Sequence, residues 1–201
     1  MDMMRLLNRT KLWLSAALKE LSLKKPLEKI TVTDLTTHSG VNRGTFYYHF
    51  KDIQDLINWT YHVDVTLPAR ELLENITLSD ITEYKVSASL LIMSNVYSSK
   101  EFYRQAIQIQ GQNNLQEFML KENTENWECL WNAVMHTNTA FLWDKKNVEY
   151  VLEYFGHAHH YALLHWIQTG MNEPPEEIAK IIDIASLRGF EGLIESCPAN
   201  Q

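Results

Sequence analysis

Residues 39–50 read SGVNRGTFYYHF, and the aromatic residues in this stretch decide how the fold is interpreted. Four of the last five side chains are aromatic rings, and the other is a histidine. A helix here would place Phe46 and Phe50 on one face, because they are four residues apart. A helix this short has one buried stripe, so the two tyrosines and the histidine between them cannot all turn inward. We therefore expect an exposed set of polar-tipped rings.

The residues around this stretch predict two short helices. Thr31 is a predicted N-cap, with an acidic residue three positions later, for a helix over 32–38 that Gly40 ends. Asn42 is the next predicted N-cap, for a second helix through Tyr48. Two helices of about seven residues joined by a tight turn form a helix-turn-helix. We place this motif at about residues 31–50.

The second helix of such a motif enters the major groove of DNA, and its side chains suit that task. Arg43 can contact a guanine edge through two hydrogen bonds, and Gly44 lets the backbone approach closely. Thr45 and Thr33 are expected to reach bases. The residues expected to contact phosphates are Thr31, Tyr47, Tyr48, His49 and Lys51. Two alternatives stay open: Tyr47 could pack against the following helix, and His49 could stabilise a helix C-terminus.

The segment ITVTDLTTHSGVNRGTFYYHFKDIQDLI, residues 30–57, resembles the DNA-binding signature of the TetR/AcrR transcriptional regulators. The resemblance implies a three-helix DNA-binding domain, a helical ligand-binding and dimerisation domain, and a homodimer on a palindromic operator. Many family members carry Lys or Arg where this chain has Ile53, so Lys51 is expected to take over that phosphate contact. The segment WIQTGMNEPPEEIA, residues 166–179, also resembles a subgroup related to dihydroxyacetone-kinase regulators.

Helical periodicity runs through almost the whole chain and predicts an all-α protein of about nine helices. We place the DNA-binding domain at residues 1–67 and the ligand-binding and dimerisation domain at 68–201, with helices expected at 68–76, 80–98, 100–110, 112–136, 146–169 and 174–195. Residues 1–60 carry a net charge of +3 and residues 61–201 carry −10. A basic N-terminal part within an acidic chain agrees with a polyanionic partner.

Several absences narrow the class of protein. No signal peptide and no apolar run of membrane-spanning length is visible, so we expect a cytoplasmic, nucleoid-associated protein of bacterial type with no membrane partner. Cys129 and Cys197 are far apart and form no CxxC pair, which fits a reducing compartment. No phosphate-binding loop, dinucleotide motif or nucleophile elbow is present. We therefore expect no catalytic residues, no cofactor and no enzymatic activity.

The last two helices predict a dimer interface. Small and apolar residues fall on one helical stripe, and the helix before it is apolar nearly all round. The residues expected at the interface are Trp166, Ile178, Ile182, Ala185, Gly189 and Gly192. The alternative is a monomer whose last helices only cover its own core.

The helices between the two ends are rich in aromatic residues and methionine, which line adaptable ligand pockets but more often form core. The residues proposed for an effector pocket are Tyr97, Phe118, Trp127, Trp131, Met135, Tyr154 and His157. The histidines of GHAHHYALLH offer an alternative, because His157 and His160, with His159 between them, could share a metal ion.

Together these observations predict a ligand-responsive homodimeric repressor that binds a palindromic, double-stranded operator through the helix beginning at Asn42. A small-molecule effector is expected, and its identity, the operator sequence and the target genes stay open. The alternatives are a regulator controlled by a partner protein or a metal ion, and a histidine-metal enzyme.

Overall fold

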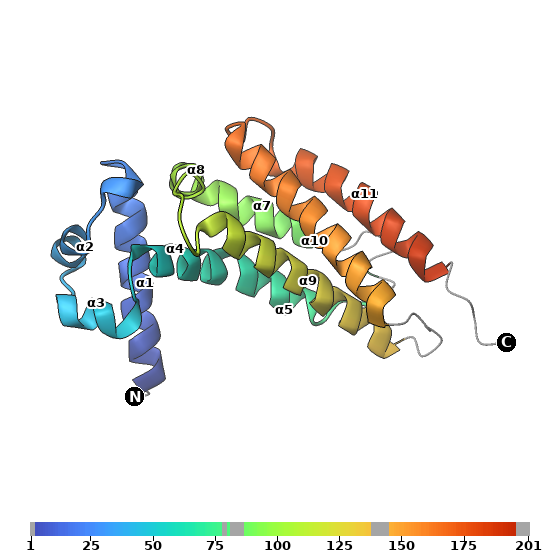
Figure 1. Cartoon of the computed structure of the whole chain (residues 1–201), viewed down its shortest axis with the longest axis horizontal. Helices are drawn as coiled ribbons and strands as arrows, with labels where there is room; N and C mark the ends of the chain where they lie inside the picture. Colours follow the sequence, from blue (N-terminus) through green and yellow to red (C-terminus); the bar gives the residue numbers. More distant parts are fainter. Residues whose placement is uncertain (1–2, 78–79, 81–86, 138–144, 196–201) are drawn as a thin grey trace. The chain divides into compact units, whose positions relative to one another are not determined.

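The computed structural model describes residues 3–77, 80, 87–137 and 145–195. Within these ranges the chain forms helices and turns and contains no strand (Figure 1), which confirms the predicted all-α class. The chain divides into two compact units. The first unit comprises Met1–Val63 and Ser99–Phe118, and the second comprises Asp64–Ser98 and Met119–Gln201.

The first unit is built around the N-terminal helices. Its elements are α1 (Met3–Ser22), a short 3-10 helix (Leu27–Lys29), α2 (Val32–Ser39), α3 (Arg43–His49), α4 (Ile53–Tyr61) and α8 (Lys100–Ala106). The core side chains come from every helix of the N-terminal bundle, and Leu14, Leu18, Leu35, Phe46 and Leu56 are fully buried. Burying such apolar side chains is the dominant stabilising term for a bundle of short helices.

Residues 99–118 pack with this first unit, although the sequence-based division placed them within 68–201. Gln105 of α8 makes the link, because its Oε1 accepts from the Leu27 backbone N at 2.8 Å and its Nε2 donates to the Ser22 carbonyl at 2.9 Å. Asn58 of α4 also donates to the Asn113 carbonyl at 2.8 Å. The functional boundary at residue 67 stays a prediction.

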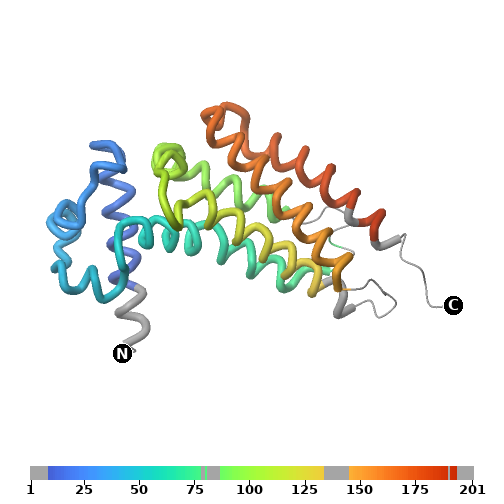
Figure 2. The backbone as a smooth tube through the Cα atoms, viewed as in Figure 1, coloured from blue at the N-terminus to red at the C-terminus, as the bar shows by residue number. Residues whose placement is uncertain are grey.

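The second unit consists of longer helices. Its elements are α5 (Leu67–Leu73), α7 (Ala88–Ser98), most of α9 (Leu115–Thr137), α10 (Lys145–Gln168) and α11 (Pro175–Glu195). A π-helical stretch, His62–Thr66, joins α4 to α5 along the chain. α7 packs against α5 and α11, and the tube in Figure 2 shows α10 and α11 running side by side.

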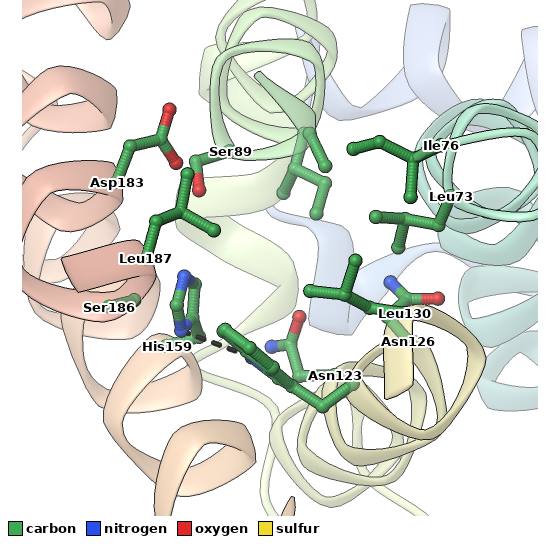
Figure 3. Close-up of a pocket in the computed structure, with 13 residues that line it drawn as sticks. Leu73, Ile76, Ser89, Asn123, Asn126, Leu130, His159, Asp183, Ser186 and Leu187 are labelled. Carbon is green, nitrogen blue, oxygen red and sulfur yellow. Dashed lines mark hydrogen bonds between the residues drawn. The ribbon is translucent and has the colours of Figure 1, made fainter. Parts of the chain in front are cut away.

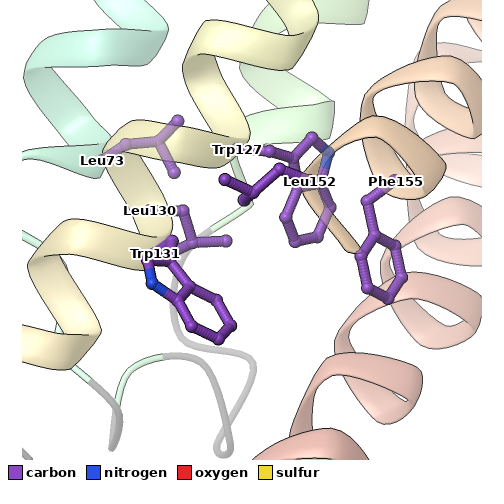
Figure 4. Close-up of a cluster of buried hydrophobic side chains, with 6 residues drawn as sticks. All are labelled: Leu73, Trp127, Leu130, Trp131, Leu152 and Phe155. Carbon is purple, nitrogen blue, oxygen red and sulfur yellow. The ribbon is translucent and has the colours of Figure 1, made fainter. Parts of the chain in front are cut away.

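A cluster of buried apolar residues holds α5, α9 and α10 together. It contains Leu73, Trp127, Leu130, Trp131, Leu152 and Phe155 (Figure 4). The rings of Trp127 and Phe155 stack with centroids 4.5 Å apart and planes 20° from parallel. Aromatic side chains bury large areas, so this cluster fixes α10 against α9.

The predicted helix boundaries agree closely at the ends of the chain and less well in the middle. α10 and α11 begin and end within one residue of the expected 146–169 and 174–195. The expected helix 100–110 ends at Ala106, and α9 begins only at Leu115. Part of the expected helix 80–98, residues 81–86, lies outside the described residues. Within the described part of the chain, no helix is long and apolar enough to cross a bilayer.

Candidate nucleic-acid interface and buried cavity

The first helix of the predicted motif, α2, begins at a capping box. The Thr31 hydroxyl accepts from the Asp34 backbone N at 3.2 Å and donates to the Asp34 carboxylate at 2.7 Å. That carboxylate also accepts from the Thr31 backbone N at 2.8 Å and from Lys25 Nζ at 2.5 Å. The Lys25 hydrogen bond, followed by those of Thr31, holds the pKa of Asp34 well below its usual range.

This capping box limits what Thr31 can offer to DNA. A hydroxyl carries a single proton, and in the cap that proton is donated to Asp34. A phosphate contact through the Thr31 hydroxyl would therefore have to break the cap. Thr33 is exposed on the same helix and remains available.

The turn between α2 and α3 has the geometry that the sequence predicts. Gly40 adopts a left-handed conformation with φ of 71°, which side chains other than glycine rarely tolerate. The Asn42 side chain then accepts from the Thr45 backbone N at 2.8 Å, as an N-cap does. Asn42 therefore begins α3, and its side-chain oxygen is engaged in the protein.

The aromatic residues of α3 divide between core and surface as expected. Phe46 and Phe50 are 0% and 3% exposed, whereas Tyr47 and Tyr48 are 49% and 73% exposed. The Phe46 and Phe50 centroids lie 6.0 Å apart, and Phe50 contacts the edge of Trp59 in α4. The buried phenylalanines fix the rotation of α3, so the tyrosines are held at the surface.

Arg43 and Tyr47 form a pair on the exposed side of α3. The Arg43 guanidinium lies 5.6 Å from the Tyr47 ring centroid, and its Nη2 donates to the Tyr47 hydroxyl at 3.4 Å. Both side chains are exposed, one turn apart on the helix. Gly44, between them in sequence, is exposed, and Thr45 is half-buried. This pair presents a cation and a hydroxyl to a ligand outside the protein.

His49 and Lys51 complete the predicted set at the end of α3. His49 is half-buried, and burial together with the nearby Lys11 lowers its pKa. A neutral imidazole can donate one hydrogen bond to a phosphate but supplies no charge. The Lys51 side chain is exposed, while its backbone N donates to the Asp55 carboxylate at 3.0 Å. Lys51 is thus placed to supply a positive charge beside α3.

Comparison with protein-family models decides the family. A model described as bacterial regulatory proteins, tetR family, matches residues 14–58, and one described as a transcriptional regulator C-terminal region matches residues 87–186. The chain belongs to the TetR family. It is a transcriptional regulator with an N-terminal DNA-binding domain, and the helix-turn-helix formed by α2 and α3 lies inside the first matched segment.

Solved structures with this fold include two proteins similar to this TetR-family chain. The dihydroxyacetone kinase operon activator DhaS aligns with a TM-score of 0.68 at 17% identity, covering 90% of this chain and 96% of DhaS. A Syntrophomonas wolfei protein assigned to the TetR family aligns with a TM-score of 0.55 at 15% identity, covering 89% and 93%. Comparison with curated proteins finds no significant match.

A buried cavity lies within the second unit of the TetR-family chain. Its volume is about 60 Å³, and side chains of α5, α7, α9, α10 and α11 line it. Trp127, which the sequence suggested for an effector pocket, forms part of the wall. Figure 3 shows that Asn123 and Asn126 of α9, His159 of α10 and Asp183 of α11 also face this space.

The other residues suggested for an effector pocket lie elsewhere. Phe118 belongs to the first unit, where it contacts Tyr61, and Trp131 is buried in the aromatic cluster. Tyr154 and His157 are exposed, and Tyr97 is 42% exposed. The side chain of Met135 lies outside those that the structure describes.

The residues that sequence reasoning missed are the polar ones. Asn123 and Asn126 share the stripe of α9 that contains Met119, Trp127 and Leu130, and all five are buried. Their spacing of three and four residues was the available signal, because it places asparagines on the apolar face of a helix.

The residues predicted for a dimer interface fall into three groups. Ala185, Gly189 and Gly192 are exposed on α11, and Ile178 and Ile182 are half-buried. Trp166 is only 2% exposed, because it stacks on Tyr97 and its Nε1 donates to the Glu173 carbonyl at 3.1 Å. The assignment of Trp166 to an exposed interface is therefore wrong.

The neighbouring histidines of α10 point in different directions. His157 is exposed, and its Nδ1 lies 3.3 Å from the Glu153 carboxylate and 2.8 Å from the Glu153 carbonyl. His159 faces the cavity, and the Nδ1 of His160 is buried without a hydrogen-bond partner. Among the described residues, no group of three or more His, Cys, Asp or Glu side chains is placed to hold a metal ion.

Proposed function

We propose that this TetR-family regulator is a ligand-responsive homodimeric repressor that binds a palindromic operator by placing α3 in the major groove. The observation that carries the proposal is the arrangement of α3. Its phenylalanines are buried while Arg43, Tyr47 and Tyr48 are exposed after the Gly40 turn. A short exposed helix with a fixed rotation is what a helix-turn-helix presents to base edges.

The proposed roles divide between bases and phosphates. Arg43, Thr45 and Thr33 are proposed to reach base edges, with Gly44 allowing close approach. Tyr47, Tyr48, His49 and Lys51 are proposed to contact phosphates. Asn42 is proposed to act through the helix start that it caps. Thr31 is proposed to act mainly through the capping box, because its hydroxyl proton is already donated to Asp34.

Dimerisation is proposed to occur through α10 and α11. Both helices expose large apolar side chains: Tyr150, Tyr154 and Tyr161 on α10, and Ile181 and Ile184 on α11. Exposed apolar patches of this kind mark interaction surfaces, and most soluble oligomers are twofold symmetric. A twofold dimer presents two copies of α3 to the two halves of a palindrome.

The proposed regulatory step is a change in the spacing of the two α3 helices when an effector enters the cavity. An effector that binds one spacing more tightly than another shifts the dimer toward that spacing, and mismatched half-sites release the DNA. A dimer bound across a promoter excludes RNA polymerase, which makes repression the expected sign. DhaS is described as an operon activator, so the position of the operator decides the outcome.

The decisive experiment is a mobility-shift assay with the DNA upstream of the protein's own gene, at a stated salt concentration. We expect a specific complex with a stoichiometry of two chains per site. The Arg43→Ala and Tyr48→Ala variants should both weaken that complex while keeping their helical content by circular dichroism. A wild-type protein that bound this DNA no more tightly than a random duplex, or that bound as one chain, would contradict the proposal.

A further inference from the structure

Two buried amide groups of α9 lack hydrogen-bond partners inside the protein. Asn123 and Asn126 are 4% and 6% exposed, and both line the cavity of the second unit. The Nδ2 of Asn123 and the Oδ1 of Asn126 have no partner. Buried polar atoms are almost always paired, so an unpaired donor and an unpaired acceptor one turn apart call for a ligand that supplies the opposite groups.

The size of the cavity restricts that ligand. The cavity volume is about 60 Å³. A space of roughly 10–15 Å³ is needed for each group the size of a water molecule, so the cavity accepts a molecule of about four to six non-hydrogen atoms. The remaining wall is largely apolar, with Leu73, Leu130 and Leu187 among its side chains. The ligand is therefore short, with its polar groups on one side.

The charges around the cavity argue against an ionised ligand. The Trp127 Nε1 donates to His159 Nδ1 at 3.2 Å, which leaves the His159 proton on Nε2. Burial lowers the pKa of His159, so the ring is neutral near pH 7. Asp183 is the single charged residue of the wall, and its carboxylate accepts from the Ser87 hydroxyl at 2.5 Å.

These groups exclude the two charged classes for different reasons. An anionic ligand would be repelled by the Asp183 carboxylate and would meet no cation among the wall residues. An ammonium ligand could pair with Asp183, but it has no acceptor to offer the Asn123 amide. Only an uncharged molecule with both an acceptor and a donor satisfies both asparagines.

We propose that the cavity binds a short hydroxycarbonyl compound, whose carbonyl oxygen accepts from Asn123 Nδ2 and whose hydroxyl donates to Asn126 Oδ1. In Figure 3 the two amides rise from α9 into the cavity, while Asp183 and Ser89 lie on its far side. The Asp183 side can receive a second hydroxyl group. That this ligand acts as an effector rests on the proposed function, whereas its binding does not.

Calorimetric titration of the full-length protein with four probes of similar size tests the proposal. The probes are hydroxyacetone, 2-butanone, glycolate and ethanolamine. We expect hydroxyacetone to bind with a Kd in the micromolar to millimolar range, which suits a ligand of about five non-hydrogen atoms. The other three should bind at least about tenfold more weakly, because each leaves an amide unpaired or brings an unfavourable charge. Equal binding of 2-butanone, preferred binding of either ion, or no binding by any probe would overturn it.

Two variants show whether the asparagines are responsible. Asn123→Leu should lose hydroxyacetone binding, whereas Asn132→Ala, on the exposed side of the same helix, should keep it. Asn126→Leu provides a second test if the first variant fails to fold, and unchanged binding in a folded variant would count against the assignment. The operator mobility shift is run on the same preparations. DNA binding without probe binding removes only this inference, and probe binding without DNA binding removes only the proposed function.

Discussion

The aromatic residues of α3 and those of the helices α9 and α10 are placed by different rules. In α3, the four-residue spacing of Phe46 and Phe50 alone determines which rings are buried, and Tyr48 turns outward as a consequence. In α9 and α10, Trp127 is buried because Phe155 stacks on it from another helix, while Tyr154 is exposed. Local spacing therefore determines burial where a helix has one neighbour, and tertiary contacts determine it in the bundle.

Removing a buried ring from α3 should have the largest effect on the first unit. Phe46→Ala is expected to destabilise it by about 3–5 kcal/mol, because Phe46 is fully buried and the substitution leaves a cavity. Tyr48→Ala should change stability by less than about 0.5 kcal/mol, since its ring is 73% exposed. Urea denaturation followed by circular dichroism measures both. Similar losses for the two variants would show that the exposed ring supports the fold.

The corresponding test in the bundle concerns the closest approach of α9 and α10. A Cβ at Gly156 would lie 2.5 Å from Thr124 Oγ1 and 2.9 Å from Thr124 Cα, so the backbone itself must move. Gly156→Ala is expected to destabilise the second unit by about 1–3 kcal/mol. Thermal unfolding measures this loss against the wild type.

Gly192→Ala is the matched control for that substitution, because a Cβ at Gly192 meets nothing within 4 Å. Helix propensity alone should then stabilise the protein by up to about 1 kcal/mol. A weaker dimer by analytical ultracentrifugation would instead place Gly192 in the proposed interface. Improved stability in Gly156→Ala would contradict the close packing of α9 on α10.

The DNA-facing side of α3 allows a test of base reading against charge. Arg43→Ala should weaken binding to the specific operator by about 1–3 kcal/mol and leave binding to random DNA nearly unchanged. Lys51→Ala should weaken both duplexes alike and flatten the dependence on salt, because a phosphate contact carries no sequence information. Fluorescence anisotropy over a salt series measures both. Equal losses on the two duplexes for Arg43→Ala would assign it to a phosphate.

The local features of the chain could be predicted from the sequence. The N-caps at Thr31 and Asn42, the turn at Gly40 and the start of α11 at Pro175 all follow from short-range rules. The helix expected over 100–110 stops earlier because the chain turns before Gly111, whose φ of 127° interrupts the helical pattern. A glycine between two periodic segments was the available signal.

The cavity could not be predicted in the same way. Its polar atoms come from Asn123 in α9, His159 in α10 and Asp183 in α11, and nothing in the local pattern brings these helices together. The same limit applies to Trp166, whose burial depends on Tyr97 in α7. Helical period gives the face of a residue, but the neighbouring helix decides whether that face is core, cavity or surface.

The smallest expected effect concerns the cap of α2 and depends on pH. Asp34 has a folded-state pKa below its unfolded value, so it stabilises the folded protein above about pH 3.9, the ordinary Asp value. That contribution is lost as the pH falls from about 4 toward the folded pKa. Asp34→Asn should therefore lower the urea midpoint at pH 7 and have a steadily smaller effect below about pH 4.

A double-mutant cycle with Lys25→Met separates the ion pair from the cap. The coupling between Lys25 and Asp34 should be present at pH 7 and vanish at about pH 3, because protonation of Asp34 removes the charge that Lys25 Nζ contacts. The part of the Asp34→Asn effect that persists in the Lys25→Met background reports the Thr31 hydrogen bonds. If the coupling stayed constant with pH, the pair would not be the main cause of the lowered pKa. The rotation of α2 would then depend on Leu35 and its neighbours in the core more than on the cap, as the bundle does.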